Sequence, residues 1–319
     1  MLDPTVTCAF TTYNAEDTIE SAIYSAINQS FKDIEIIIVD DCSTDNTFSI
    51  IKNIAKITNL RIKFFPHDSN KGVAEARNSC IKYAAGEFIC FFDDDDQSHQ
   101  DRIEKQLERL IAYERSIKNN NSNSTTALCY GDRLIHYENR SPIFCRAIST
   151  TDVKIHSEAY AKALLSAGAF PMKGKAGSSA TCTLFARRKL FLDLNLFNPE
   201  LRRCEDLDLA IKAVINKVEL ISTNSLIVNQ YYTDTLDKKG SYIYEFKILK
   251  IHEKWLKKRN LYEFAYLYLK LKDNLFEFKI CNFLKLAFII FLKYPINASK
   301  KLMSSLSTIL FTLKYRFKI

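Results

Sequence analysis

The amino-acid sequence predicts an α/β fold in which a mostly parallel central sheet is flanked by helices and followed by a C-terminal helical extension. Three observations predict it. Short β-branched apolar runs alternate with helical repeats over the first hundred residues, polar residues follow these runs directly, and glycine is absent after Gly240. Strands that alternate with helices are typical of parallel sheets with right-handed crossovers.

The first hundred residues form strand, helix, strand units. Val6–Phe10 and Ile34–Val39 are short apolar runs, as expected of strands buried on both faces. Between them Ile19, Ile23 and Ile27 recur at helical spacing behind a polar start. The same alternation predicts helices over 46–57, 73–84 and 101–116, and strands over 61–65, 87–92 and 127–130. Because such sheets bind ligands beyond the carboxyl ends of their strands, the polar residues there are the candidates for function.

The rest of the chain contains two predicted loops and one predicted domain boundary. Residues 118–126 are polar and rich in turn formers, which predicts a surface loop. Residues 149–183 carry small residues suited to a mobile loop beside a site. We place a domain boundary near Gly240, which gives one domain over residues 1–240 and a basic, aromatic-rich helical extension over 241–319.

The cysteines and the N-terminus indicate the cellular compartment in which we expect the protein. Nine cysteines stand singly, with no Cys-x-x-Cys pair and no histidine at zinc-finger spacing. Unpatterned thiols indicate a reducing environment and argue against structural zinc. The N-terminus lacks the basic start and long apolar run of a signal peptide. We therefore expect a cytoplasmic protein.

Four consecutive carboxylates, Asp93–Asp96, follow the strand predicted over 87–92. They would repel one another at the end of an apolar strand, and a bound cation removes that cost. Oxygen-rich sites suit Mg²⁺ or Mn²⁺. The alternative is a solvated acidic turn, which is what charge runs usually form. The position at the ligand-binding edge of the sheet favours the metal.

Asp40 ends the second predicted strand in the same way. Its carboxylate is placed to accept hydrogen bonds from a base N–H or a ribose hydroxyl. Ser43, Thr44 and Asp45 are typical of a turn and helix cap, and the alternative assigns Asp40 to the same capping role. Tyr13 follows the first strand, where its ring either stacks on a base or packs on the protein.

Four segments follow one another within the first hundred residues: Thr11–Asn14, Val39–Asn46, Asn70–Asn78 and Phe92–Asp96. Their order resembles that of the family 2 glycosyltransferases of the GT-A fold. Each segment alone is weak, but the four in order form a specific signal. The resemblance implies a Rossmann-like GT-A catalytic domain that uses a nucleotide-sugar.

The resemblance also implies residue roles on the donor side. Thr11, Tyr13 and Asp40 would hold the nucleotide, usually UDP. Lys71 and Arg77 would lie near the nucleotide-binding face.

The metal site and the catalytic base follow from the same resemblance. Asp93 and Asp95 would form the Asp-x-Asp motif that holds Mn²⁺ or Mg²⁺, with Asp94 on the donor between them. Asp206 would be the general base of an inverting transfer, and Glu205 would support it; the alternative is a pair of acids that favour a helix N-terminus. The Gln-x-x-Arg-Trp segment of processive synthases is missing after Asp206, which favours transfer of a single sugar.

The sequence thus predicts a metal-dependent hexosyltransferase that moves a sugar to a glycan or lipid-linked acceptor in bacterial surface polysaccharide synthesis, of the lipopolysaccharide or capsule type. One alternative is a sugar-phosphate nucleotidyltransferase, although the first glycine is Gly72 and no glycine-rich phosphate loop follows the first strand. A non-catalytic nucleotide- or glycan-binding protein is the other alternative. The sequence leaves oligomer formation open.

The tail carries most of the positive charge. Residues 245–319 hold 16 Lys or Arg and 5 Asp or Glu, together with 15 aromatic residues. The apolar run Phe283–Leu292 is too short to span a bilayer. Basic, aromatic helices suit the cytoplasmic face of the inner membrane, and packing on the enzyme or on a second copy is the alternative. No nucleic-acid-binding module is visible, so we expect no nucleic acid partner.

Overall fold

The computed structural model describes residues 5–58, 61–119, 126–149, 161, 165, 177–232, 241–295 and 298–299. The chain divides into two compact units. The first lies within residues 1–154 and 176–236, and the second within 155–175 and 237–319. The boundary predicted near residue 240 falls in 233–240, outside the described residues.

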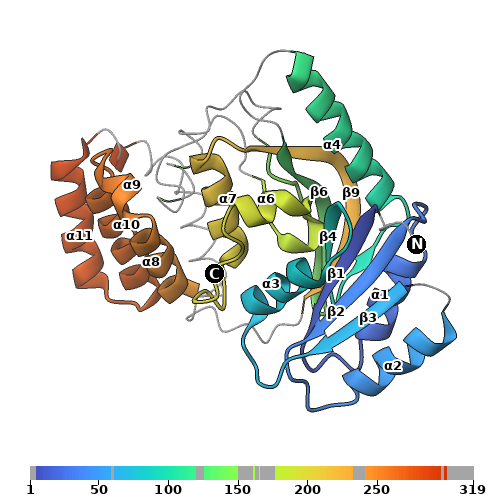
Figure 1. The fold of residues 1–319 in the computed structure, drawn as a ribbon. Coiled ribbons are helices and arrows are strands. Elements are labelled where there is room, and N and C mark those ends of the chain that lie inside the picture. The colour runs from blue at the N-terminus through green and yellow to red at the C-terminus, as the bar shows by residue number, and fades with distance from the viewer. Residues whose placement is uncertain are drawn as a thin grey trace. The chain divides into compact units, whose positions relative to one another are not determined.

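A nine-stranded sheet forms the centre of the first unit. Its first half is all parallel, in the order β3-β2-β1-β4 (Figure 1). These strands are β1 (Val6–Thr12), β2 (Ile34–Asp40), β3 (Arg61–Pro66) and β4 (Phe88–Asp93). Parallel order places the carboxyl ends of all four strands at one edge of the sheet.

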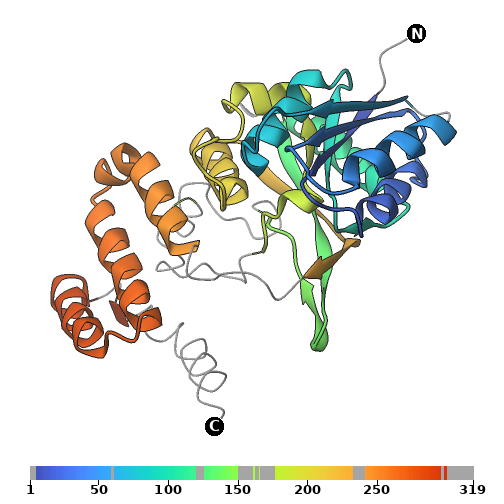
Figure 2. The ribbon, with the colours of Figure 1, turned by 90° about the horizontal axis from the view of Figure 1, so that it is seen from below.

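The second half of the sheet is mixed. Two long strands, β6 (Ala127–Tyr137) and β9 (Glu219–Tyr232), run parallel to each other. The short strand β8 (Phe185–Arg187) is antiparallel to both β4 and β6 and joins the two halves. β5 (Gln97–Ser98) and β7 (Arg140–Cys145) pair antiparallel with β9 and β6, and the β6–β7 hairpin extends away from the sheet (Figure 2). The expected parallel order therefore holds for the first four strands and gives way to mixed pairing beyond them.

Helices cover both faces of the sheet (Figure 1). On one face Val6, Cys8 and Phe10 of β1 belong to a core that includes buried residues of three helices, α1 (Ile19–Ile27), α2 (Thr47–Ile57) and α4 (Arg102–Asn119). The other face carries α3 (Val73–Tyr83), α6 (Arg188–Asp193) and α7 (Glu205–Ile215). Side chains alternate between the two faces along each strand, so both layers draw on the same apolar runs.

The predicted elements of the first hundred residues all occur, with shifts of one or two residues at their ends. The predicted strand 127–130 continues to Tyr137, and α4 continues to Asn119, so the predicted loop begins later than expected. Residues 120–125 of that loop are outside the described part of the chain. Most of the predicted loop 149–183 is outside it too; its described end carries a short 3-10 helix, η1 (Thr181–Thr183).

The second unit is helical, as predicted for the extension. It contains α8 (Ser241–Ile251), α9 (Glu253–Lys257), α10 (Tyr262–Phe276) and α11 (Ile280–Lys293). Phe264 of α10 and Ile290 of α11 are buried together at the centre of that pair. Among the helices that the structure describes, none has the length and apolarity needed to cross a bilayer.

Candidate active site

A cleft of about 380 Å³ opens at the carboxyl edge of the parallel strands. It is lined by residues at or just after the ends of β1, β2 and β4, by the loop before α3 and the start of that helix, and by one arginine that precedes α7. These residues are Thr11, Thr12, Tyr13, Asp41, Asn70, Gly72, Val73, Ala76, Arg77, Asp93, Asp94, Asp95 and Arg202. Six of the ten residues predicted from the sequence are among them. The other four, Asp40, Lys71, Glu205 and Asp206, do not line the cleft.

The ends of β1 and β4 bring the first cleft residues together. Thr11 and Asp93 are register partners on the two neighbouring strands. The backbone N–H of Tyr13 donates a hydrogen bond to Asp94 Oδ2 at 3.1 Å, and Tyr13 is 49% exposed. This exposed aromatic ring at the cleft is available to stack on a planar ligand.

The carboxylates after β4 resist ionisation. Burial raises the pKa of Asp94 to about 6, although hydrogen bonds from Thr12 and the Tyr13 N–H favour its charge. Asp95 reaches solvent, yet partial burial and the charges of Asp93 and Asp94 raise its pKa to about 7. Such a cluster is unfavourable at neutral pH without a counter-charge, and a divalent cation supplies one.

A group of metal-ligating atoms lies at the same edge. Ligand atoms of Asp93, Asp96 and Cys182 lie within 4.8 Å of one another. Asp96 Oδ1 accepts a hydrogen bond from the Tyr231 N–H at 3.1 Å, while its buried Oδ2 has no hydrogen bond of normal geometry among the described residues. Burial raises the pKa of the Cys182 thiol well above its usual range, so this sulfur stays protonated and is a poor ligand for a hard cation. The carboxylates therefore fit Mg²⁺ or Mn²⁺, and the thiol adds little.

Arg77 connects these carboxylates to α7. Its Nη2 donates to Asp93 Oδ1 at 3.2 Å, and its Nη1 donates to Glu205 Oε1. Burial opposes the charge of Arg77, but the carboxylates of Asp93, Glu205 and Asp206 outweigh burial and raise its pKa. Because Arg77 is buried between two carboxylates, substituting it would leave both of them without their charged partner. The Arg77–Glu205 contact joins residues that are 128 positions apart in sequence.

Asp206 lies in the first turn of α7. Cys204, the residue before the helix, adopts the left-handed conformation with φ 62°, and the helix begins at Glu205. Asp206 Oδ1 accepts a hydrogen bond from the Leu207 N–H at 2.7 Å. Burial and the charge of Glu205 raise the pKa of Asp206 to about 6, against the opposing charge of Arg77. Asp206 thus has a pKa close to that of a general base working near neutral pH.

Two adjacent carboxylates follow β2 and differ in what they contact. Asp40 accepts hydrogen bonds from the Ser43 N–H at 3.2 Å and from the Ser43 hydroxyl, which is the capping contact considered as the alternative. Asp41 lines the cleft and accepts from the backbone N–H groups of Lys71 at 2.8 Å and Gly72 at 2.7 Å. Lys71 therefore approaches Asp41 through its backbone, while its side chain is not among the cleft-lining groups.

Four polar cleft residues were not predicted from the sequence: Thr12, Asp41, Asn70 and Arg202. Arg202 Nη1 donates to Asn70 Oδ1 at 2.9 Å, which joins the loop before α3 to the segment before α7. Gly72 adopts φ 90°, which suits glycine, and lies beneath Arg202. Successive side chains of a strand point to opposite sides, so whether Asp40 or Asp41 faces the cleft depends on the local twist of the strand end. The Arg202 contact spans 132 positions and leaves no local signal.

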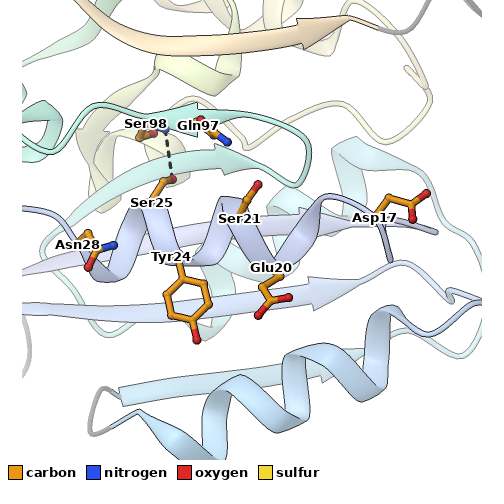
Figure 3. Close-up of a pocket in the computed structure, with 8 residues that line it drawn as sticks. All are labelled: Asp17, Glu20, Ser21, Tyr24, Ser25, Asn28, Gln97 and Ser98. Carbon is orange, nitrogen blue, oxygen red and sulfur yellow. Dashed lines mark hydrogen bonds between the residues drawn. The ribbon is translucent and has the colours of Figure 1, made fainter.

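A second hollow of about 560 Å³ lies along α1 and β5 (Figure 3). Its lining residues all carry polar side chains and are Asp17, Glu20, Ser21, Tyr24, Ser25, Asn28, Gln97 and Ser98. The Ser98 N–H donates to Ser25 Oγ at 3.2 Å, a hydrogen bond that joins β5 to α1 (Figure 3). None of the predicted site residues lies in it.

The site defines a class of protein that binds a ligand at the carboxyl edge of an α/β sheet, with acidic groups from two parts of the chain. Residues 7–120 match the sequence profile of Glycosyl transferase family 2. WfaP of Escherichia coli, a UDP-Glc:α-D-GlcNAc-diphosphoundecaprenol β-1,3-glucosyltransferase, is 44% identical over 95 residues, which are 30% of this chain and 37% of WfaP. The chain thus matches curated relatives over less than half of their length.

Solved structures with the same fold extend the likeness beyond the matched region. Staphylococcus aureus TarS in complex with UDP-GlcNAc superposes with a TM-score of 0.54 at 18% identity, over 77% of this chain and 65% of the TarS chain. GalNAc-T7 with UDP, GalNAc and Mn²⁺ gives a TM-score of 0.51 at 16% identity, over 72% and 44%. At these identities the comparison concerns the fold alone. The fold is GT-A, as the sequence resemblance implied.

Proposed function

We propose that this chain is an inverting glycosyltransferase that moves a single sugar from a nucleotide-sugar to a hydroxyl of a glycan or lipid-linked acceptor. The observation that carries the proposal is the buried Arg77, which contacts Asp93 at the cleft and Glu205 beside Asp206. One side chain thereby places the carboxylates that suit a metal–diphosphate close to the acid that suits a base. A nucleotidyltransferase or a simple binding protein has no need of a basic carboxylate held there.

The donor is a UDP-sugar in this proposal. Thr11, Tyr13 and Asp41 line the cleft and offer a hydroxyl, an aromatic face and a carboxylate, which suit a base and a ribose. Asp40 and Lys71, predicted from the sequence for the same role, act through the turn and loop that shape this wall.

A divalent metal, Mn²⁺ or Mg²⁺, completes the donor site. Asp93 and Asp95 would hold it, with Asp94 on the donor, because oxygen ligands at the cleft match the preference of hard cations. When bound, the metal neutralises the negative charge that develops on the departing diphosphate. The raised pKa of Asp95 supports this assignment, since partial burial and the charges of Asp93 and Asp94 disfavour its ionised form, which a bound cation would favour.

Asp206 acts as the base. The acceptor hydroxyl oxygen attacks the anomeric carbon, its proton moves to the Asp206 carboxylate, and the bond from that carbon to the diphosphate oxygen breaks, so the nucleoside diphosphate leaves. Glu205 supports Asp206 by holding Arg77, and Arg77 balances the charges of both acids. Back-side attack of this kind inverts the configuration at the anomeric carbon.

The acceptor belongs to bacterial surface polysaccharide synthesis, of the lipopolysaccharide or capsule type. The support is the acceptor in the name of WfaP, a diphosphoundecaprenol-linked sugar. Such an acceptor is anchored in a membrane by its polyprenyl chain, so we propose that the reaction takes place at the cytoplasmic face of the inner membrane.

A donor screen tests the proposed function. The purified chain, with Mn²⁺ and a lipid-linked or soluble glycan acceptor, is expected to release UDP from one or a few UDP-sugars and to leave GDP-sugars intact. A luminescent assay of free nucleotide measures this across the panel. Release of pyrophosphate from a nucleoside triphosphate and a sugar phosphate would instead identify a nucleotidyltransferase.

His67 is expected to position the donor wall. Its Nδ1 lies 2.8 Å from Asp41 Oδ1, and its Nε2 lies 2.9 Å from Ser79 Oγ. A buried hydrogen bond to a charged group contributes roughly 1.5–3 kcal/mol, so we expect His67→Ala to raise the KM for the donor by about tenfold or more and to change kcat much less. Steady-state kinetics separates the two effects, with the exposed neighbour substitution Asp68→Ala as the control. A loss confined to kcat would contradict the positioning role.

A further inference from the structure

The outer face of α11 is apolar and exposed. Leu284 is 61%, Phe288 64% and Leu292 65% exposed, and Ile280 and Phe291 are more than half exposed as well. Positions 280, 284, 288 and 291–292 recur at helical spacing, so the five side chains form one continuous stripe. We call this stripe the α11 face. Scattered exposed apolar residues are common, but a contiguous stripe on one helix marks an interaction surface.

The core of the helical unit does not need the α11 face. Ile290, on the opposite side of α11, is buried against Phe264 of α10, with Leu267, Tyr268 and Tyr294 packed around them. Tyr294 also donates a hydrogen bond to Glu263 Oε2 at 2.9 Å. The helix is therefore anchored on α10 by one side and presents a second apolar side outward.

The charges around the α11 face are positive. Lys279 immediately precedes α11, Lys285 lies within it and Lys293 is its last residue, and no acidic residue occurs between positions 278 and 295. Lys293 pairs with Glu263, whereas Lys279 and Lys285 have no carboxylate partner in the part of the chain that the structure describes. An apolar stripe beside unpaired lysines complements a surface that is apolar inside and anionic outside.

We propose that the α11 face docks on the surface of an anionic phospholipid bilayer. A helix of 14 residues is about 21 Å long, too short for a hydrocarbon core of about 30 Å, so it lies in the plane of the interface. A second copy is the main competing occupant. A two-fold interface through this face would place the positive charges of two α11 helices in one interface, and these like charges would oppose it. Anionic headgroups supply the opposite charge instead.

Vesicle co-sedimentation of the full chain tests this proposal. Wild type is expected to bind vesicles of phosphatidylcholine with phosphatidylglycerol more tightly than vesicles of phosphatidylcholine alone. Leu284→Ser with Phe288→Ser should weaken binding to the anionic vesicles by about tenfold or more, because the stripe loses two of its five apolar side chains. The control is Ile143→Ser with Phe144→Ser, which removes two exposed apolar residues of β7 and should bind as wild type does.

A second variant tests the charges without touching the apolar stripe. Lys279→Glu with Lys285→Glu is expected to abolish the preference for anionic over neutral vesicles. Equal binding of wild type and the serine variant would overturn the proposal. So would a wild-type dimer in sedimentation velocity that the serine variant converts to a monomer, because a second copy would then cover the face. UDP release by the same variants with a soluble acceptor should match wild type, so a failure here is distinct from a failure of the proposed function.

Discussion

Turnover by Asp206→Asn is expected to fall by roughly 10²–10⁴-fold, the usual contribution of a positioned general base. The amide has nearly the same shape as the carboxylate but cannot accept the proton of the acceptor hydroxyl. Because burial and the charge of Glu205 already disfavour the ionised form of Asp206, its removal should leave the melting temperature at pH 7.5 unchanged or raised. UDP release with acceptor, together with thermal unfolding, measures both effects.

The pH dependence of turnover is a second test of the role of Asp206. The base works only when deprotonated, and the pKa of Asp206 is about 6, so wild-type kcat at saturating Mn²⁺ should fall as the pH drops through about 6. The residual rate of Asp206→Asn should show no such step. Asp193→Asn, which alters an exposed ion pair with Lys189 on α6, is the matched control and should retain both the rate and the pH profile. Normal turnover by Asp206→Asn would remove Asp206 from the mechanism.

Asp95→Ala is expected to lower metal-dependent turnover by roughly a hundredfold or more, since a metal ion contributes several kcal/mol to charge stabilisation during phosphate departure. Its affinity for UDP in the presence of Mn²⁺ should fall, while its affinity for UDP in EDTA should change little. Isothermal titration calorimetry in the two buffers separates the metal contribution from the nucleotide contacts. The fold should be retained because Asp95 is exposed and its neighbours are carboxylates that gain from its loss.

Two further variants, Asp96→Asn and Cys182→Ser, distinguish between two possible sets of metal ligands. Asp95 comes from the sequence motif, whereas the structure groups Asp93 with Asp96 and Cys182. Cys182→Ser should keep metal-dependent UDP binding if carboxylates alone hold the ion. If Asp96→Asn and Cys182→Ser lost the Mn²⁺ effect while Asp95→Ala kept it, the buried group would be the metal site and the motif assignment would be wrong.

The fold was predictable from the sequence because its elements carry local signals. The apolar runs of β1, β2 and β4 and the helical spacing of α1 are each contained within ten or so residues, and parallel order follows from their alternation. The mixed half of the sheet was not predictable in this way. β8 is three residues long, too short for a periodic pattern, and its place between β4 and β6 depends on contacts across more than fifty positions.

The residues of the site also fall into those with a local sequence signal and those without one. Residues at strand ends, such as Tyr13 and Asp93, were found because a strand end is visible in the sequence. The link from Arg77 to Glu205 and the contact of Arg202 with Asn70 form only when α7 approaches α3, so no local pattern announces them. The exposed stripe on α11 is an intermediate case, because the sequence shows a helix that is apolar on nearly every side, and only the structure shows which side α10 covers.

The stereochemistry of transfer tests the central claim most directly. We expect proton NMR of the product formed from whichever UDP-α-sugar supports turnover to show a β-linkage at the transferred anomeric carbon. That outcome requires a single displacement with a base such as Asp206 on the acceptor side of the sugar. A product with the α-linkage retained would contradict the account, because Asp206 and the Arg77 connection would then have no part in the proposed displacement.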